Sequence, residues 1–216
     1  MPEVASGSYP YGRSALKDAG LDPDHDVTWV AVGLGATAAN AFRQKEIEAW
    51  AAWDTGVAAL ENGGFRFVKI DPSWHDKMPG SVIITHVDLL KKRPDLVAKF
   101  LRGMAKATVF ALANPDATIR NHWRMYPSTK PQDTSPKGFA DSLNIYNSRA
   151  IRLGKPDGRK WGESVDAEWD RLVQYSSEPL VAKGTGLRSA YTNELVAEIN
   201  KFDEAAVIAE AKASKW

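Results

Sequence analysis

The sequence contains no cysteine, so disulfides, thiolate metal ligands and thiol nucleophiles are all excluded. Its basic residues outnumber its acidic residues by only one, and a net charge of +1 gives no electrostatic reason to expect binding to nucleic acid or membranes. No apolar run approaches the length of a membrane span. The four histidines are scattered, without the spacing of a metal site. No nucleophile–base pair is evident, so binding fits these residues better than catalysis.

The 216 residues are 44% hydrophobic and 25% charged, which is typical of a globular chain with one large domain or two small ones. The N-terminal residues Met1 to Val4 lack the basic region and apolar core of a secretion signal, so we expect no such signal in this chain. The hydrophobic period changes near residue 87. We therefore predict an α/β ligand-binding lobe over residues 1–86 and a helical C-terminal region over 87–216.

Short apolar runs rich in β-branched and aromatic residues predict strands, at residues 4–6, 27–32, 49–53, 65–70 and 81–86. Helical periodicity predicts helices between and after them, at residues 9–18, 36–44, 56–62, 87–92, 94–113, 115–125, 137–153, 163–175, 192–200 and 202–212. The strand, glycine turn, helix and strand of residues 27–54 form one βαβ unit, which requires parallel pairing. The predicted fold class is therefore α/β, with a mainly parallel sheet followed by a helical half.

The carboxyl ends of parallel strands meet at one edge of a sheet, where ligands bind. This rule places the chain after residue 6, the Gly33 turn and the chain after residue 53 around one opening. Ser6, Gly7 and Ser8 precede a helix, so their hydroxyls and the helix dipole favour a carboxylate, sulfonate or phosphate. The alternative is that Ser8 only caps that helix.

Two aromatic residues of this opening, Tyr9 and Trp53, are placed to hold an apolar or planar ligand between them. Asp54 is able to accept hydrogen bonds from a ligand, or to pair with Arg13. Trp74 is a further candidate at the same edge. The predicted ligand site therefore comprises eight residues, namely Ser6, Gly7, Ser8, Tyr9, Gly33, Trp53, Asp54 and Trp74.

The glycine turn permits another interpretation. The run from Gly33 to Ala38 fits a dinucleotide fingerprint with alanine in the last place, and Asp54 follows where a ribose-binding acid belongs. An NAD-type oxidoreductase domain that uses Gly33, Gly35 and Asp54 is thus the alternative function. In a third interpretation the glycines only make a tight turn, and Asp54 only caps the next helix.

Several stretches together resemble the solute-binding proteins of bacterial ABC importers, in the nitrate, sulfonate and taurine branch related to thiamine-pyrimidine precursor proteins. They are A-S-G-S-Y-P-Y-G-R from residue 5, A-G-L-D-P-D-H-D-V-T-W-V-A-V-G-L-G from residue 19, E-A-W-A-A-W-D from residue 48, R-P-D-L-V-A-K-F-L-R-G-M-A-K-A-T-V-F-A-L-A-N-P-D from residue 93 and N-E-L-V-A-E-I-N-K-F-D-E-A-A-V from residue 193. The resemblance implies a type II periplasmic-binding-protein fold of two hinged lobes, without a cofactor. It implies a periplasmic location, an ABC permease as partner, and a sulfonate, taurine, nitrate or aromatic acid as ligand.

The resemblance also assigns residues. It puts Ser6, Gly7, Ser8 and Tyr9 in the ligand loop of the second lobe, and Trp53 and Asp54 at a strand end facing the cleft. Relative to the family, this chain starts where the second lobe begins, so it resembles a member that lacks the N-terminal lobe or finds it as a separate chain. The apolar stripes of residues 195–199 and 202–208 would then need a new partner, and we expect the isolated chain to self-associate or to be marginally stable.

Overall fold

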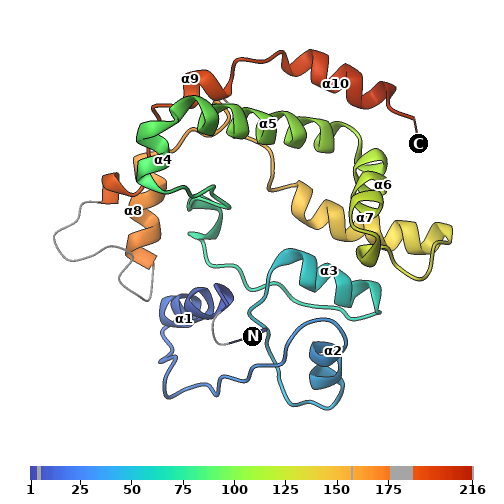
Figure 1. Ribbon diagram of the computed structural model, residues 1–216. Helices are drawn as coiled ribbons and strands as arrows, with labels where there is room; N and C mark the ends of the chain where they lie inside the picture. The colour runs from blue at the N-terminus through green and yellow to red at the C-terminus, as the bar shows by residue number, and fades with distance from the viewer. Residues whose placement is uncertain (4–5, 157, 176–186, 216) are drawn as a thin grey trace. The chain divides into compact units, whose positions relative to one another are not determined.

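The computed structural model describes residues 1–3, 6–156, 158–175 and 187–215, and the chain divides into two compact units. Unit 1 comprises Met1–Pro79 and Asp166–Leu187, and unit 2 comprises Gly80–Val165 and Arg188–Trp216. In both units the described elements are helices joined by irregular chain (Figure 1). No described helix has the combination of length and hydropathy that crossing a membrane requires.

Unit 1 contains four α-helices and one 3₁₀ turn among its described residues: α1 (Ser8–Asp18), α2 (Ala36–Arg43), α3 (Asp54–Asn62), η1 (His75–Lys77) and α8 (Asp166–Tyr175). Its core lies between α2 and α3, where Ala38, Ala39 and Leu60 are buried. Aromatic side chains of the connecting segments complete this core, chiefly Trp50, Phe65 and Phe67 around Phe42 of α2.

The described part of unit 2 is also helical, with α4 (Val87–Lys92), α5 (Pro94–Ala113), α6 (Pro115–Met125), η2 (Pro127–Thr129), α7 (Pro136–Ala150), α9 (Val196–Ile199) and α10 (Glu204–Ala213). A further 3₁₀ turn, η3 (Leu187–Ser189), lies at the boundary between the units. Helices α5, α6 and α7 each begin with a proline, because the first helical position needs no N–H and suits the fixed φ of proline.

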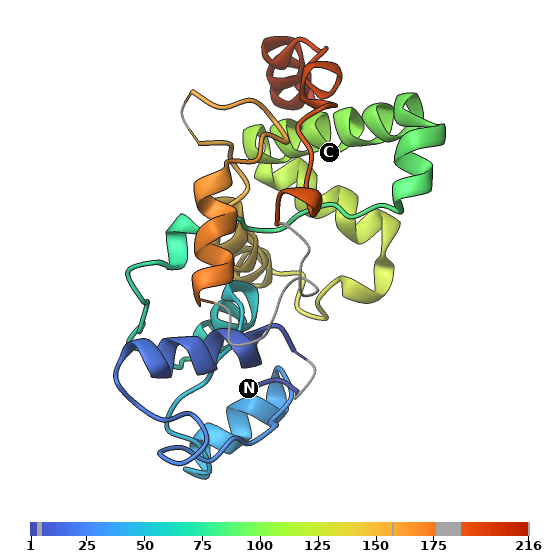
Figure 2. The same ribbon diagram turned by 90° about the vertical axis from the view of Figure 1, so that its left-hand side faces the viewer.

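Helix α5 is the scaffold of unit 2, and α9 and α10 pack along it (Figures 1 and 2). The Arg102 Nε donates to the Glu198 carbonyl oxygen at 2.8 Å, and the Asn114 Nδ2 donates to the Ala211 carbonyl oxygen at 2.7 Å. The buried C-terminal side chains are Val196, Ile199, Val207 and Ala211. The apolar stripes that we expected to need a new partner are therefore covered, in large part, inside unit 2.

The prediction of a mainly parallel sheet is wrong. None of the described residues forms a strand, and the segments 27–32, 49–53, 65–70 and 81–86 are irregular chain. Of the predicted strand 4–6, residues 4 and 5 lie outside the described residues. One short contact of the parallel type occurs: the Met1 amino group donates to the Val30 carbonyl at 3.1 Å, and the Val32 N–H donates to the Met1 carbonyl at 3.0 Å.

The physical reason is that β propensity measures how well a side chain fits a half-buried surface, and a helix is also able to supply that surface. Phe65 and Phe67 pack on Phe42 of α2 rather than on a neighbouring strand. Val68 and Ile70, which follow them, are 91% and 81% exposed. The alternation in residues 65–70 was real, but the partner strands needed to turn it into a sheet are not present in the described structure.

Candidate functional site

Two serine hydroxyls lie together where α1 begins. The Ser6 and Ser8 Oγ atoms are 2.8 Å apart, and Ser6 is 7% exposed. Gly7 occupies the N-cap position, so Ser8 lies inside the helix and does not cap it. Ser6 binds the first free N–H groups instead: its Oγ accepts from the Ser8 N–H at 3.3 Å, and its carbonyl accepts from the Tyr9 N–H at 2.9 Å.

This arrangement changes how an anion would be held at α1. The usual backbone donors of a helix N-terminus are partly occupied by Ser6, and Pro10 has no N–H to offer. The hydroxyls of Ser6 and Ser8 are therefore the chief donors at this end, assisted by the positive end of the helix dipole.

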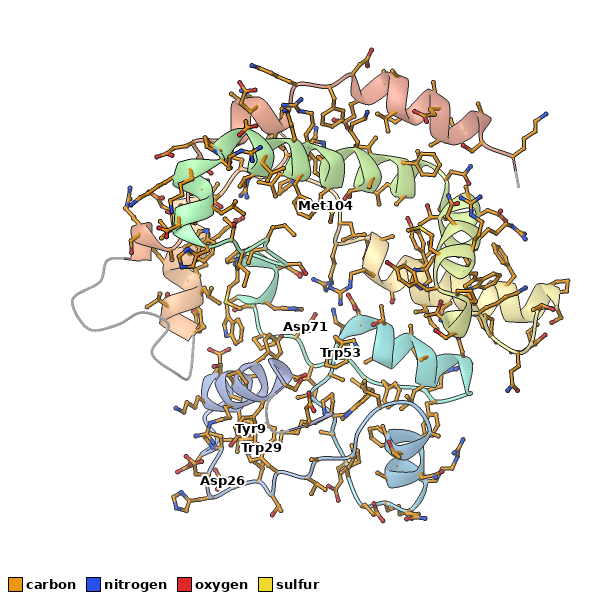
Figure 3. All side chains as sticks on the ribbon, in the orientation of Figure 1. Tyr9, Asp26, Trp29, Trp53, Asp71 and Met104 are labelled. Atoms are coloured by element: carbon orange, nitrogen blue, oxygen red, sulfur yellow. The ribbon has the colours of Figure 1, made fainter. Side chains whose placement is uncertain are left out.

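Tyr9 is packed by Trp29 of the chain that follows α1 and by Arg13 of α1 itself. Its ring makes an edge contact with Trp29, with ring centres 4.9 Å apart, and the Arg13 guanidinium lies 5.6 Å from its ring centre. The labelled side chains of Tyr9 and Trp29 lie next to each other in Figure 3. Trp29 is fixed in turn by its Nε1, which donates to the Pro23 carbonyl at 2.8 Å. Tyr9 is thus held in one orientation by its neighbours.

Arg13 pairs with Asp24, whereas we had considered Asp54 as its partner. The two guanidinium nitrogens of Arg13 donate to the two carboxylate oxygens of Asp24 at 2.6 and 2.8 Å. This fork of hydrogen bonds lowers the pKa of Asp24 below its ordinary value and raises the pKa of Arg13. The Arg13 charge is therefore already balanced within unit 1.

The Gly33 turn and Trp53 meet at the first turn of α3. Gly33 and Gly35 have φ values of +68° and +57°. A residue with a Cβ atom is strained in this region, so glycine is favoured at both positions. The Thr37 hydroxyl closes the turn by donating to the Leu34 carbonyl at 2.8 Å. A Cβ atom at Gly56 would lie 3.7 Å from both the Leu34 Cδ2 and the Trp53 Nε1. The structure therefore brings together two of the segments that the sequence predicted to share an opening.

Trp53 and Asp54 begin α3. Trp53 occupies the N-cap position with extended backbone and is 38% exposed, so part of its ring is available to a ligand. The Asp54 Oδ1 accepts the Thr55 N–H at 2.7 Å, and a negative charge in the first turn complements the helix dipole. Asp54 is thus the first residue of α3, and Trp53 occupies the N-cap position that one of the alternatives gave to Asp54.

Trp74 lies in a packed aromatic cluster of unit 1, and only 2% of it is exposed. Its ring stacks on Tyr175 of α8, with centres 4.8 Å apart, and makes an edge contact with Tyr11 of α1 at 5.4 Å. Its Nε1 has no hydrogen-bond partner among the described residues. The sequence did not point to Tyr11 or Tyr175, since their contacts with Trp74 join residues far apart along the chain.

A shallow depression of about 280 Å³ lies between α2 and α3, and the sequence did not predict it. It is lined by Gly35, Ala36, Ala39, Arg43, Ala59, Leu60, Gly63 and Phe65. The Arg43 guanidinium lies 5.1 Å from the Phe65 ring centre and supplies the cationic side chain of this lining. The one available signal was the spacing of Ala36, Ala39 and Arg43 on one face of the helix.

The dinucleotide interpretation requires a strand before its glycine turn, and residues 27–32 do not form one. The helix after the turn, α2, has 8 residues. Among the described residues no group of three histidine, aspartate or glutamate side chains is placed to hold a metal ion.

A family model described as NMT1/THI5 like matches residues 6–118, which is just over half of the chain. The match begins at Ser6, includes the whole of α1, α2 and α3, and continues through α5 into α6. All eight residues of the predicted ligand site lie within it. No curated protein sequence and no solved structure matches the chain significantly.

Proposed function

The chain belongs to the NMT1/THI5-like family, and we propose that it binds a small anionic organic compound at the N-terminal ends of α1 and α3. Membership supports a substrate-binding role of the ABC-importer type, in a family composed mainly of binding proteins. The observation that carries the proposal is Trp53, a half-exposed aromatic side chain held beside the glycine turn at the start of α3.

The proposed chemistry follows from the groups at these helix ends. The Ser6 and Ser8 hydroxyls donate to a sulfonate, nitrate or carboxylate group, and Gly7 lets the ligand approach the backbone. Tyr9 and Trp53 contact the apolar part of the ligand, and Asp54 accepts from a ligand N–H such as the ammonium of taurine. Gly33 shapes the turn beside Trp53, and Trp74 supports α1 through its edge contact with Tyr11.

The proposed partners are a small-molecule ligand and the permease of an ABC importer, which receives the ligand from the binding protein. A binding protein of this type works outside the cytoplasmic membrane, and we propose a periplasmic or extracellular location for this chain. Binding and delivery require no bond to be made or broken, so the proposed function needs no catalytic residue and no cofactor.

Calorimetric titration of the purified chain with taurine, an alkanesulfonate, nitrate, benzoate and NADH tests the proposal. We expect one of the first four compounds to bind and NADH not to bind. Trp53→Ala should weaken that binding by about 2 kcal/mol, the loss typical of a central aromatic contact, or about 30-fold in affinity. Binding of NADH alone would favour the oxidoreductase alternative.

Trp123→Ala is the matched control. Trp123 lies in α6 of unit 2, where it contacts Phe139 edge-on, and it does not belong to the proposed site. The same aromatic side chain is thus removed from a helical position. Equal losses of affinity in the two variants would mean that Trp53 makes no specific contact with the ligand, and the proposed site would be wrong.

A further inference from the structure

Three side chains of unit 1 converge above Gly56, in the first turn of α3. A Cβ atom at this position would lie 3.4 Å from the Trp50 Cη2 and 3.7 Å from both the Leu34 Cδ2 and the Trp53 Nε1. These are ordinary van der Waals distances, so the space above Gly56 has room for one carbon atom that touches all three side chains. Gly56 does not have a positive φ, so its backbone conformation does not require glycine.

The walls of this space are held in place by other parts of unit 1. The Trp50 ring makes an edge contact with Phe42 of α2, with ring centres 6.4 Å apart, and belongs to the packed core. Leu34 lies in the glycine turn, where its carbonyl accepts from the Thr37 hydroxyl at 2.8 Å. The space is therefore formed before a ligand arrives, and a preformed site loses less free energy to ordering when it binds.

The same space is accessible to a small molecule. Leu34 and Trp53 are 44% and 38% exposed, and Gly56 is half-buried. Two of the three atoms that line the space are carbon, and the third belongs to an aromatic ring. The Asp54 carboxylate lies in the first turn of the same helix and repels the charged group of an anionic ligand. An apolar part of the ligand, rather than its anionic group, therefore fits above Gly56.

We propose that Gly56 is a specificity-determining residue of the ligand site, because its missing side chain leaves room for a carbon atom of the ligand between Leu34 and Trp53. This inference rests on the proposed function and narrows the ligand to an organic anion with an apolar part, such as an alkanesulfonate or benzoate. Nitrate has no carbon atom to place in this space. Any residue with a Cβ atom at position 56 would occupy the space itself and exclude the ligand.

Calorimetric titration of the full chain with butanesulfonate, benzoate and nitrate tests this role of Gly56. We expect butanesulfonate or benzoate to bind more tightly than nitrate. Gly56→Ala should weaken that binding at least about tenfold, since one carbon atom in an apolar pocket changes affinity by such a factor. The midpoint of its thermal unfolding should equal or exceed that of the wild type, because the added Cβ makes only ordinary contacts and alanine favours a helix.

Gly103→Ala is the matched control, since it makes the same change in α5 of unit 2, where nothing lies within 4 Å. It should leave the affinity unchanged. Binding that Gly56→Ala does not weaken would overturn the inference, and the proposed function still stands if Trp53→Ala weakens that binding.

A lowered unfolding midpoint of Gly56→Ala would also overturn the inference, because Gly56 would then be required for packing. So would nitrate binding as tightly as the two organic anions. If none of the three compounds binds, the inference is wrong, and if taurine also fails to bind, the proposed function is wrong as well.

Discussion

Arg13 joins α1 to the loop that follows it, because its guanidinium binds Asp24 and lies against the Tyr9 ring of its own helix. Since Asp24 has a lowered pKa in the folded state, the pair contributes stability above the unfolded pKa of about 3.9 and loses it as the pH falls through the folded value. We expect Asp24→Asn to destabilise the protein at neutral pH, and the difference from wild type to vanish in acid. Urea unfolding between pH 2 and pH 7 measures it.

Asp18→Asn provides the control, as an exposed carboxylate in the last turn of the same helix. Its effect on the free energy of unfolding should be small over the whole range. A wild-type advantage over Asp24→Asn that persists unchanged at the lowest pH would show that the Asp24 charge does not stabilise the fold.

Gly12 of α1 is required by close packing rather than by its backbone conformation. A Cβ atom at this position would lie 2.9 Å from the Trp29 Cη2 and 3.1 Å from the Ala51 Cβ. Gly12→Ala should therefore lower the free energy of unfolding by about 1–3 kcal/mol, as overpacking does. Gly103→Ala in α5, where nothing lies within 4 Å, should raise it by about 0.5–1 kcal/mol. Thermal unfolding of both variants distinguishes the two cases.

For individual residues, the sequence predicted local motifs better than it predicted which side chains pair with each other. The serines before α1 and the Gly33 turn were recognisable from local patterns, and the structure places the Gly33 turn beside Trp53. The pairing of Arg13 with Asp24 was missed, because it depends on how residues 22–26 fold back over α1. That the eight predicted residues share one ligand site stays a prediction.

Asn114 is a single residue on which three helices depend. It separates α5 from α6, its Oδ1 accepts the Ala117 N–H at 3.0 Å, and its Nδ2 donates to the Ala211 carbonyl of α10. Asn114→Ala should lower the free energy of unfolding by about 1–2 kcal/mol, combining a lost cap with a lost hydrogen bond. Asn114→Asp keeps the acceptor and loses only the donor, so it should be less destabilising. Equal losses in the two variants would show that the cap contributes nothing.

Helices were the elements that the sequence predicted well. Helices α4, α5 and α6 have the predicted bounds, because prolines, capping residues and charge at the ends are local signals. The buried face of α5 is harder to predict than its bounds: Val97, Ala98, Ala105 and Val109 are buried, whereas Met104 is 44% exposed. The hydrophobic period of α5 can be recognised in its sequence, whereas its buried face depends on packing against α9 and α10.

The strand predictions were wrong for a related reason. A strand exists only when another strand pairs with it, and residues 27–32 illustrate the difference. Their apolar run suggested a buried strand, but Val30 is 39% exposed and Trp29 packs on Tyr9. Met1 bonds to Val30 and Val32 as at the start of a parallel pair, and the Gly33 N–H bonds to the Pro2 carbonyl at 2.9 Å, yet none of the described residues belongs to a strand. The local sequence indicates which segments are extended, but it does not indicate which other segment would pair with them in a sheet.

The chain divides into two compact units, and each contains its own set of helices. The division that the sequence predicted, into 1–86 and 87–216, stays a prediction. The C-terminal stripe was expected to need a new partner, yet Val196, Ile199 and Val207 are buried within unit 2.

The central claim is that this family member binds an anionic ligand where α1 and α3 begin. Hydrogen exchange with and without saturating taurine, alkanesulfonate, nitrate or benzoate tests it most directly, since the method reports where a compound binds. We predict that at least one compound slows exchange at residues 6–9 and 53–56 while leaving α10 unchanged. Protection confined to the depression between α2 and α3, or no protection by any of the four compounds, would contradict the claim.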